Sequence, residues 1–102
     1  MQSTIQEILQ FRKERNWHVN QDARSLAISI SLEANELLEP FQWCTGEEAV
    51  ATHHQEIKEE IADVLIYLVA LADHMDIDLQ EAVTEKLKIN LNKYPVPEKT
   101  KL

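Results

Sequence analysis

The chain has 102 residues, a mass of 11.8 kDa and a formal net charge of −8, and it is 44% hydrophobic and 27% charged. This length and composition are typical of one folded domain and exclude an intrinsically disordered chain. The single glycine, Gly46, excludes the glycine-rich loops that cradle phosphates, because these need several glycines at fixed spacing.

Four helices are predicted, and no segment alternates polar and apolar residues as a strand would. The capping-box pattern that begins at Ser3 predicts that the first helix starts near this residue. Its apolar positions share one helical face with a charged residue, and this face consists of Ile5, Ile8, Leu9 and Arg12. Residues 16–21 lose the helical period and are expected to form a loop that carries Trp17.

The second, third and fourth helices follow from caps and breakers. Asp22 is expected to cap a helix that runs to about Glu39, where Pro40 ends it. The third helix is predicted over residues 56–74, with a start as early as residue 47 left open, and Asp78 is expected to cap the fourth. The expected fold class is therefore an all-α, four-helix bundle. We place the domain at residues 1–95 and an extended tail at 96–102, where prolines disfavour helix.

The apolar faces of these helices predict both a core and an assembly. The side chains expected to face inward are Leu26, Ile30, Ala34, Leu37, Leu38, Ile57, Ile61, Val64, Leu65, Leu68, Ala72, Leu79, Val83, Leu87 and Leu91. Residues 64–72 form a run of nine residues that is apolar on every side of its helix. A membrane span needs about 20 residues, so we expect no membrane association. A bundle this small can hardly bury such a helix alone, so we expect an oligomer formed through the helices.

The negative charge is confined to one segment. Residues 33–63 hold nine acidic side chains and one basic one, Lys58, while the rest of the chain carries equal numbers of each sign. Because this field repels phosphate backbones, we expect no nucleic-acid partner, and we expect multivalent cations to be attracted. The lone cysteine, Cys44, and a start without a basic head and apolar run favour a cytoplasmic protein.

Two pairs of carboxylates carry the chemical signal. Glu33 and Glu36 lie three residues apart on one helix and therefore share a face, and Glu60 and Asp63 repeat this spacing on another helix. Both pairs adjoin apolar residues, where an unpaired charge is costly. Oxygen ligands without histidine or cysteine favour Mg²⁺, with Mn²⁺ as a substitute, and Mg²⁺ in turn favours a di- or triphosphate ligand. The alternative is that these acids form a solvated helix face.

Four ordered blocks carry a family resemblance over about residues 5–96. They are ERNW at 14–17, ELLEPFQW at 36–43, EEIADVLIYL at 59–68, and KLKIN at 86–90 with KYP at 93–95. With the pairs Glu33-x-x-Glu36 and Glu60-x-x-Asp63, the chain resembles the MazG-like all-α nucleoside triphosphate pyrophosphohydrolases, and within them the dCTP pyrophosphatase branch. The resemblance implies Mg²⁺-dependent hydrolysis of nucleoside triphosphates, expected here to be dCTP, dATP or both, to the monophosphate and pyrophosphate. It also implies a house-cleaning role and a homo-oligomer, with a tetramer built as two dimers favoured and a dimer possible.

The resemblance also implies roles for individual residues. The metal ligands would be Glu33, Glu36, Glu60 and Asp63. Apart from the resemblance, a carboxylate not fully used in coordination, Glu33 or Glu36, is expected to act as the catalytic base. The substrate-binding residues would be Trp17, Gln21, Trp43, Tyr67, Asn90, Lys93 and Tyr94. Gln21 departs from the histidine that some dCTP-preferring relatives place there, and an amide offers a different set of donors and acceptors.

Other interpretations remain open for several of these side chains. Trp17 and Trp43 can simply cover the ends of a bundle, Tyr67 can be a core residue, and Lys93 can interact with a helix dipole. His53 and His54 are expected to be exposed loop residues. A di-iron site is excluded because no Glu-x-x-His motif is present. The alternative function is a non-catalytic helical oligomeric interaction module with an acidic face.

Overall fold

The computed structural model describes residues 1–19 and 21–97, and these residues form helices and no strand. The elements in chain order are α1 (Gln2–Glu14), α2 (Ala23–Leu38), the 3₁₀ turn η1 (Glu39–Phe41), α3 (Gly46–Thr52), α4 (His54–His74) and α5 (Leu79–Lys93). The predicted all-α fold class is confirmed. No helix within this described part is long and apolar enough to cross a membrane.

The predicted caps are correct at two helices and wrong at a third. Asp22 Oδ1 accepts from the backbone N–H of Ser25 at 2.7 Å, and Asp78 Oδ1 accepts from that of Glu81 at 3.0 Å. The capping box at Ser3 does not form, because α1 begins one residue earlier and its N-cap, Met1, makes no side-chain cap bond.

The helix predicted over residues 56–74 is confirmed as α4, whereas the earlier start left open at residue 47 belongs to a separate fifth helix of the described chain, α3. Thr45 caps α3 by accepting from the backbone N–H of Glu48 at 3.1 Å. At the other end, the Thr52 hydroxyl donates to the Glu48 carbonyl at 2.7 Å, and His53 leaves the helical conformation with φ −117° and ψ 27°. A threonine that bonds back to the preceding turn weakens a helix locally, which explains a break at this point. His53 and His54 therefore lie at a helix junction and not in a loop.

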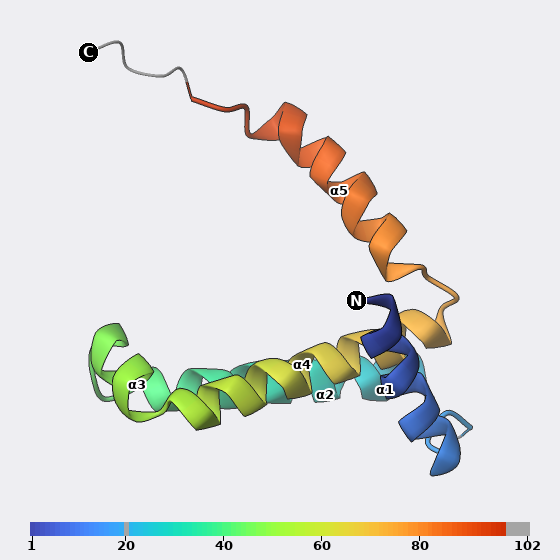
Figure 1. Ribbon diagram of the computed structural model, residues 1–102, viewed down its shortest axis with the longest axis horizontal. Helices are drawn as coiled ribbons and strands as arrows, with labels where there is room; N and C mark the ends of the chain where they lie inside the picture. The colour runs from blue at the N-terminus through green and yellow to red at the C-terminus, as the bar shows by residue number, and fades with distance from the viewer. Residues whose placement is uncertain (20, 98–102) are drawn as a thin grey trace.

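The body of the molecule is a pair of long helices, α2 and α4, that lie side by side (Figure 1). α1 packs across one end of α4, and α3 lies at the other end. The buried apolar side chains are Leu26, Ala49, Val69, Ala70 and Ala72. Of the predicted inward positions, Ala34, Leu38, Ile61 and Leu68 are exposed instead, because two paired helices bury only one stripe of each other.

α5 stands away from this body (Figure 1). Gln2 Nε2 donates to Gln80 Oε1 at 3.0 Å and ties its first turn to α1, but the predicted inward residues Val83, Leu87 and Leu91 are more than half exposed. The radius of gyration is 17.4 Å, whereas about 13 Å is typical of a compact chain of this length. The single chain therefore leaves the apolar face of α5 without a partner, which the sequence pattern alone could not reveal.

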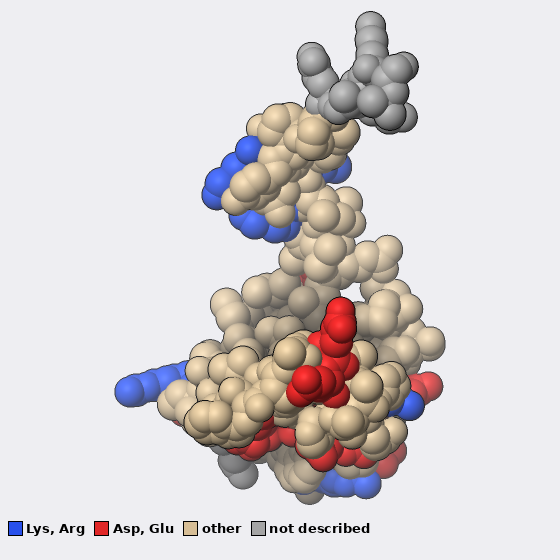
Figure 2. Space-filling model, turned by 90° about the vertical axis from the view of Figure 1, so that its left-hand side faces the viewer, with Lys and Arg blue, Asp and Glu red and all other residues tan. Residues whose placement is uncertain are grey.

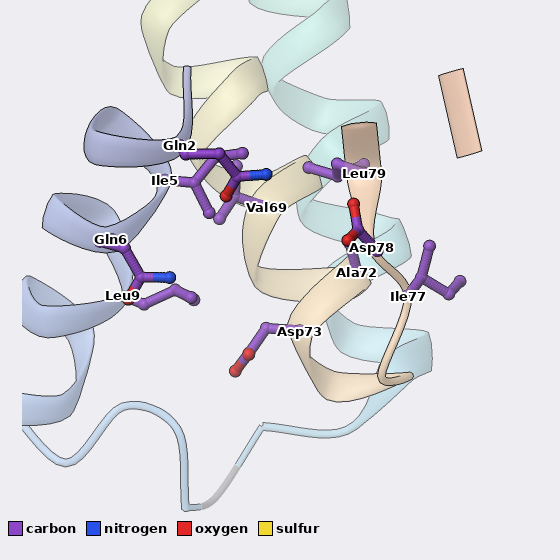
Figure 3. A pocket seen from close by; sticks show the side chains of 10 residues that line it. All are labelled: Gln2, Ile5, Gln6, Leu9, Val69, Ala72, Asp73, Ile77, Asp78 and Leu79. Carbon is purple, nitrogen blue, oxygen red and sulfur yellow. The ribbon is translucent and has the colours of Figure 1, made fainter. Parts of the chain in front are cut away.

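Two features flank the start of α5. A cavity of about 190 Å³ lies between α1, the end of α4 and residues 77–79 (Figure 3). Beyond α5, residues 95–97 have no regular structure, and the remainder of the predicted tail, residues 98–102, lies outside the described residues.

Candidate active site

Three carboxylates from the two long helices meet at one point. Glu33 and Glu36 are on α2 and Glu60 is on α4, and one carboxylate oxygen of each lies within 4.8 Å of the others. The i, i+3 spacing turns the two α2 carboxylates to the same side, and the pairing of α2 with α4 places Glu60 opposite them. Asp63 lies one turn along α4, half-buried, outside this group of three but close enough to act on Glu60 electrostatically.

The environment of this cluster opposes its negative charge. Burial, with hydrogen bonding to and repulsion from Glu60 and Glu36, raises the pKa of Glu33 to about 7. Burial likewise raises the pKa of Glu60, and repulsion from Glu36 and Asp63 adds to the shift. Because mutual repulsion makes it costly for all of these carboxylates to ionise together, a bound proton or a cation would stabilise the cluster.

Two observations fit a divalent cation to the cluster. Glu33 Oε2 and Glu60 Oε2 are buried and accept no hydrogen bond from the described residues. No Lys or Arg of the described chain lies within 4.0 Å of these carboxylates to neutralise them. A set of carboxylate oxygens suits the hard cations Mg²⁺ and Mn²⁺, whereas zinc sites favour sulfur and imidazole ligands. The residues present therefore fit such an ion.

The predicted aromatic residues lie at different places along the helix pair. Tyr67 is half-buried on α4, one turn after Asp63. Asn16, two residues after the end of α1, has a left-handed conformation with φ 57°. The ring of Trp17 then packs edge-on against that of Phe11, with 5.7 Å between the ring centroids. Trp43 follows the opposite end of α2 and is 93% exposed. A single chain therefore does not bring the two tryptophans into one pocket.

The predicted substrate-binding residues of α5 are also distant from the carboxylates in a single chain. Asn90 and Lys93 belong to α5, which stands off the body, and Lys93 Nζ lies 5.5 Å from the ring of Tyr94. Figure 2 shows acidic side chains at the α3 end of the body and basic side chains on α5. The basic residues of this helix are Lys86, Lys88 and Lys93.

Sequence reasoning missed two polar residues. His53 is half-buried at the α3–α4 junction, and its Nδ1 lies 3.4 Å from Glu56 Oε1. The spacing of three residues was the available signal, because residues three apart are neighbours on a helix surface. Arg12 on α1 is only 5% exposed. Its place in line with Ile5 and Ile8 was the available signal, because a charged residue on an apolar face is either buried or aligned with a site.

The paired helices and their carboxylates define an all-α protein with a site suited to a divalent cation. The profile of the MazG-like family matches residues 28–102. The chain belongs to the MazG-like family, and the resemblance predicted from the sequence is confirmed at this level.

Known relatives are similar over most of this chain. It is 40% identical over 91 residues to dCTP pyrophosphatase 1 of Homo sapiens, which covers 84% of this chain and 54% of that protein. The Mus musculus protein of the same name is 38% identical over 92 residues, with 85% and 54% covered. The chain thus spans about half the length of these curated relatives. The crystal structure of a pyrophosphatase from Archaeoglobus fulgidus is 41% identical, covers 94% of this chain and 93% of its own, and superposes with a TM-score of 0.85.

Proposed function

We propose that this protein hydrolyses nucleoside triphosphates, with dCTP, dATP or both as substrates, to the monophosphate and pyrophosphate. The observation that carries the proposal is the meeting of Glu33, Glu36 and Glu60, with two buried oxygens lacking a partner, in a chain of the MazG-like family. The names of the similar proteins, dCTP pyrophosphatase 1 and a pyrophosphatase, support this substrate class and reaction.

In this proposal the carboxylates hold Mg²⁺, or Mn²⁺ in its place. Glu33, Glu36, Glu60 and Asp63 are the ligands. When bound, the metal supplies neutralisation of the triphosphate charge and Lewis-acid polarisation of its oxygens. The preferred point of attack is the α-phosphorus, with pyrophosphate as the leaving group.

One carboxylate takes up the proton of the attacking water. Glu33 is one candidate for this role, because its carboxylate lies within the cluster at which the triphosphate would bind. Glu36, one turn further along the same face of α2, is the other candidate for this role.

The remaining substrate contacts require a second copy of the chain. Trp17, Gln21 and Tyr67 lie along one end of the body and would contact base and sugar, whereas Trp43 is exposed at the other end and Asn90, Lys93 and Tyr94 are on α5. Packing α5 of one copy against the acidic body of another would bury Val83 and Leu87 and bring Lys93 to a phosphate. We propose a homo-oligomer in the cytoplasm, a tetramer of two dimers or a dimer, whose sites are shared between copies.

A direct assay tests the proposed function. The full chain is incubated with each common ribo- and deoxyribonucleoside triphosphate and Mg²⁺, and monophosphate and pyrophosphate are measured, with chelator added as the control. Release of pyrophosphate that the chelator abolishes supports the proposal. If no triphosphate is hydrolysed and Mg²⁺ with nucleotide leaves the melting temperature unchanged, the protein is instead a non-catalytic helical interaction module.

A further inference from the structure

Arg12 is the one charged side chain in the described residues that the fold buries. Burial lowers the pKa of its guanidinium, and the proximity of Tyr67 and Asp73 opposes this. An arginine stays charged in spite of such a shift. No carboxylate of the described chain lies within 4.0 Å of it. Burying a charge without a directly bonded partner is costly, so packing alone does not account for an arginine at this position.

Arg12 borders two cavities of different character. The first has a volume of about 30 Å³, and its polar lining includes His18, Gln21 and Asp73. The second has about 250 Å³, and its lining includes the apolar side chains of Phe11, Trp17 and Ile66. A single buried water needs roughly 10–15 Å³ of such space. The first cavity therefore admits one small polar group, whereas the second admits a flat ring.

The small cavity contains a polar atom that lacks a partner. Gln21 Oε1 is buried and accepts no hydrogen bond from the described residues. Asp73 projects from α4 on the side that faces α1, as Figure 3 shows. The cavity thus offers a donor-only group, Arg12, beside the acceptors Gln21 Oε1 and the Asp73 carboxylate.

This pair of cavities is aligned with the carboxylate cluster. Tyr67 lies one turn of α4 beyond Asp63 and is near enough to Arg12 to affect its pKa. Asp73 follows ten residues after Asp63 on the same helix, which corresponds to about 15 Å along its axis. A triphosphate at the carboxylates would therefore direct its sugar past Tyr67 and its base toward Arg12.

We propose that Arg12, with Gln21 and Asp73, reads the hydrogen-bonding edge of the nucleobase and selects cytosine and adenine, in which an exocyclic amino group lies beside a ring nitrogen acceptor on the Watson–Crick edge. The inference rests on the proposed function and adds specificity residues to it. The ring lies in the apolar cavity, its amino group donates to Gln21 or Asp73, and Arg12 donates to the ring acceptor. A keto oxygen in place of the amino group leaves the buried Gln21 Oε1 unpaired, which is the arrangement that rejects a wrong substrate most strongly.

The first test uses the unmodified protein and changes the substrate. Values of kcat/KM are measured for dCTP against dUTP and the 2-pyrimidinone analogue, which lacks the amino group, and for dATP against its purine analogue without that group. We expect a loss of at least about tenfold for each substrate without the amino group. Equal values within each pair overturn the inference. Hydrolysis of every triphosphate at similar rates leaves the proposed function standing, whereas hydrolysis of none removes both.

The second test assigns the selection to Arg12. Arg12→Met keeps an unbranched stem and removes the guanidinium donors, Arg12→Lys restores a charge, and Lys13→Met is the exposed control on the same helix. We expect Arg12→Met to raise KM for dCTP about tenfold or more with a smaller fall in kcat and a smaller change for dUTP, and Arg12→Lys to recover part of the loss. If Arg12 is purely structural, or simply pairs with Gln21, Arg12→Met should lower kcat/KM by the same factor for every substrate. That result overturns the inference. If Arg12→Met does not fold, Arg12→Lys decides: an altered ratio of kcat/KM for dCTP to that for dUTP supports the assignment, and an unaltered ratio overturns it.

Discussion

The α2–α4 pair and α5 have amphipathic sequences of the same kind, but only the α2–α4 pair buries its apolar face within one chain. α2 and α5 both begin after an aspartate cap and both carry an apolar face at helical spacing. Yet Val69 of α4 is 1% exposed in the helix pair, and Val83 of α5 is 55% exposed. An amphipathic pattern shows that a face needs a partner and does not show where the partner is. The pair therefore brings its carboxylates together within one copy of the chain, whereas the exposed apolar residues of α5 have no partner among the described residues of one copy.

The largest expected effect concerns the carboxylate cluster of the α2–α4 pair. Glu60→Gln keeps the shape of the side chain and removes one charge from the cluster, so we expect turnover of the preferred triphosphate to fall by about a hundredfold or more. The metal-free protein should melt at the same or a higher temperature, because the repulsion within the cluster is relieved.

The matched control is Glu47→Gln on α3, which removes an equal charge from an exposed position outside the cluster. Turnover and melting temperature are measured for both variants and for the unmodified protein. Activity in Glu60→Gln equal to that of the control would remove the carboxylate cluster from the mechanism.

The next largest effect is expected on the exposed apolar face of α5. Leu87→Asp places a charge on the exposed apolar face of α5, where Leu87 is 59% exposed in one copy. If this face packs against a second copy, burying the charge is costly, so light scattering should show smaller particles at micromolar concentration and activity should fall at least about tenfold. Asn92→Asp, with the same change of charge on the opposite face of the helix, should leave particle size unchanged. Dimers or tetramers of undiminished size in Leu87→Asp would place the interface elsewhere.

A smaller effect is expected at Trp43, which follows the end of α2 and, like the apolar face of α5, is exposed in one copy. Its ring is 93% exposed in one copy, so Trp43→Ala should not disturb the fold. If the ring stacks on a base bound to another copy, the variant loses roughly 1–3 kcal/mol of stacking, which raises KM more than it lowers kcat. Steady-state kinetics are compared with those of Val50→Ala, a truncation of another exposed apolar residue. A fall in kcat with KM unchanged would contradict a role in substrate binding.

The sequence predicted local features of the fold better than their three-dimensional partners. The aspartate caps, the all-α class and the shared face of Glu33 and Glu36 all depend on spacing along a helix, which a sequence displays directly. Glu60 meets these two only because α2 pairs with α4. The break at His53 depended on a side-chain bond from Thr52 that competes with helix continuation, and a periodic pattern does not show it.

The outward face of α5 could not be predicted for a related reason, and the place of Arg12 on an apolar face left open whether it is buried or aligned with a site. Both depend on what lies across from a helix face, and that is decided by tertiary packing rather than by propensity. Val83 and Leu87 were predicted to face inward because they lie on an apolar helix face, but one copy of the chain leaves both exposed.

The smallest expected effect is a dependence of stability on pH that comes from the helix pair alone. Glu33 has a pKa of about 7 in the folded protein against an ordinary value of 4.5, so the folded state binds this proton more tightly than the unfolded state. Its stabilising contribution is therefore complete below about pH 4.5 and is lost as the pH rises through about 7. The melting temperature of the metal-free protein should fall between pH 5 and pH 8, and Glu33→Gln, which cannot ionise, should weaken this fall while Glu47→Gln keeps it. Because α5 carries none of the cluster carboxylates, Leu87→Asp should keep the pH dependence even where it changes the assembly. A pH profile that Glu33→Gln leaves unaltered would show that the proton is held elsewhere than in the α2–α4 pair.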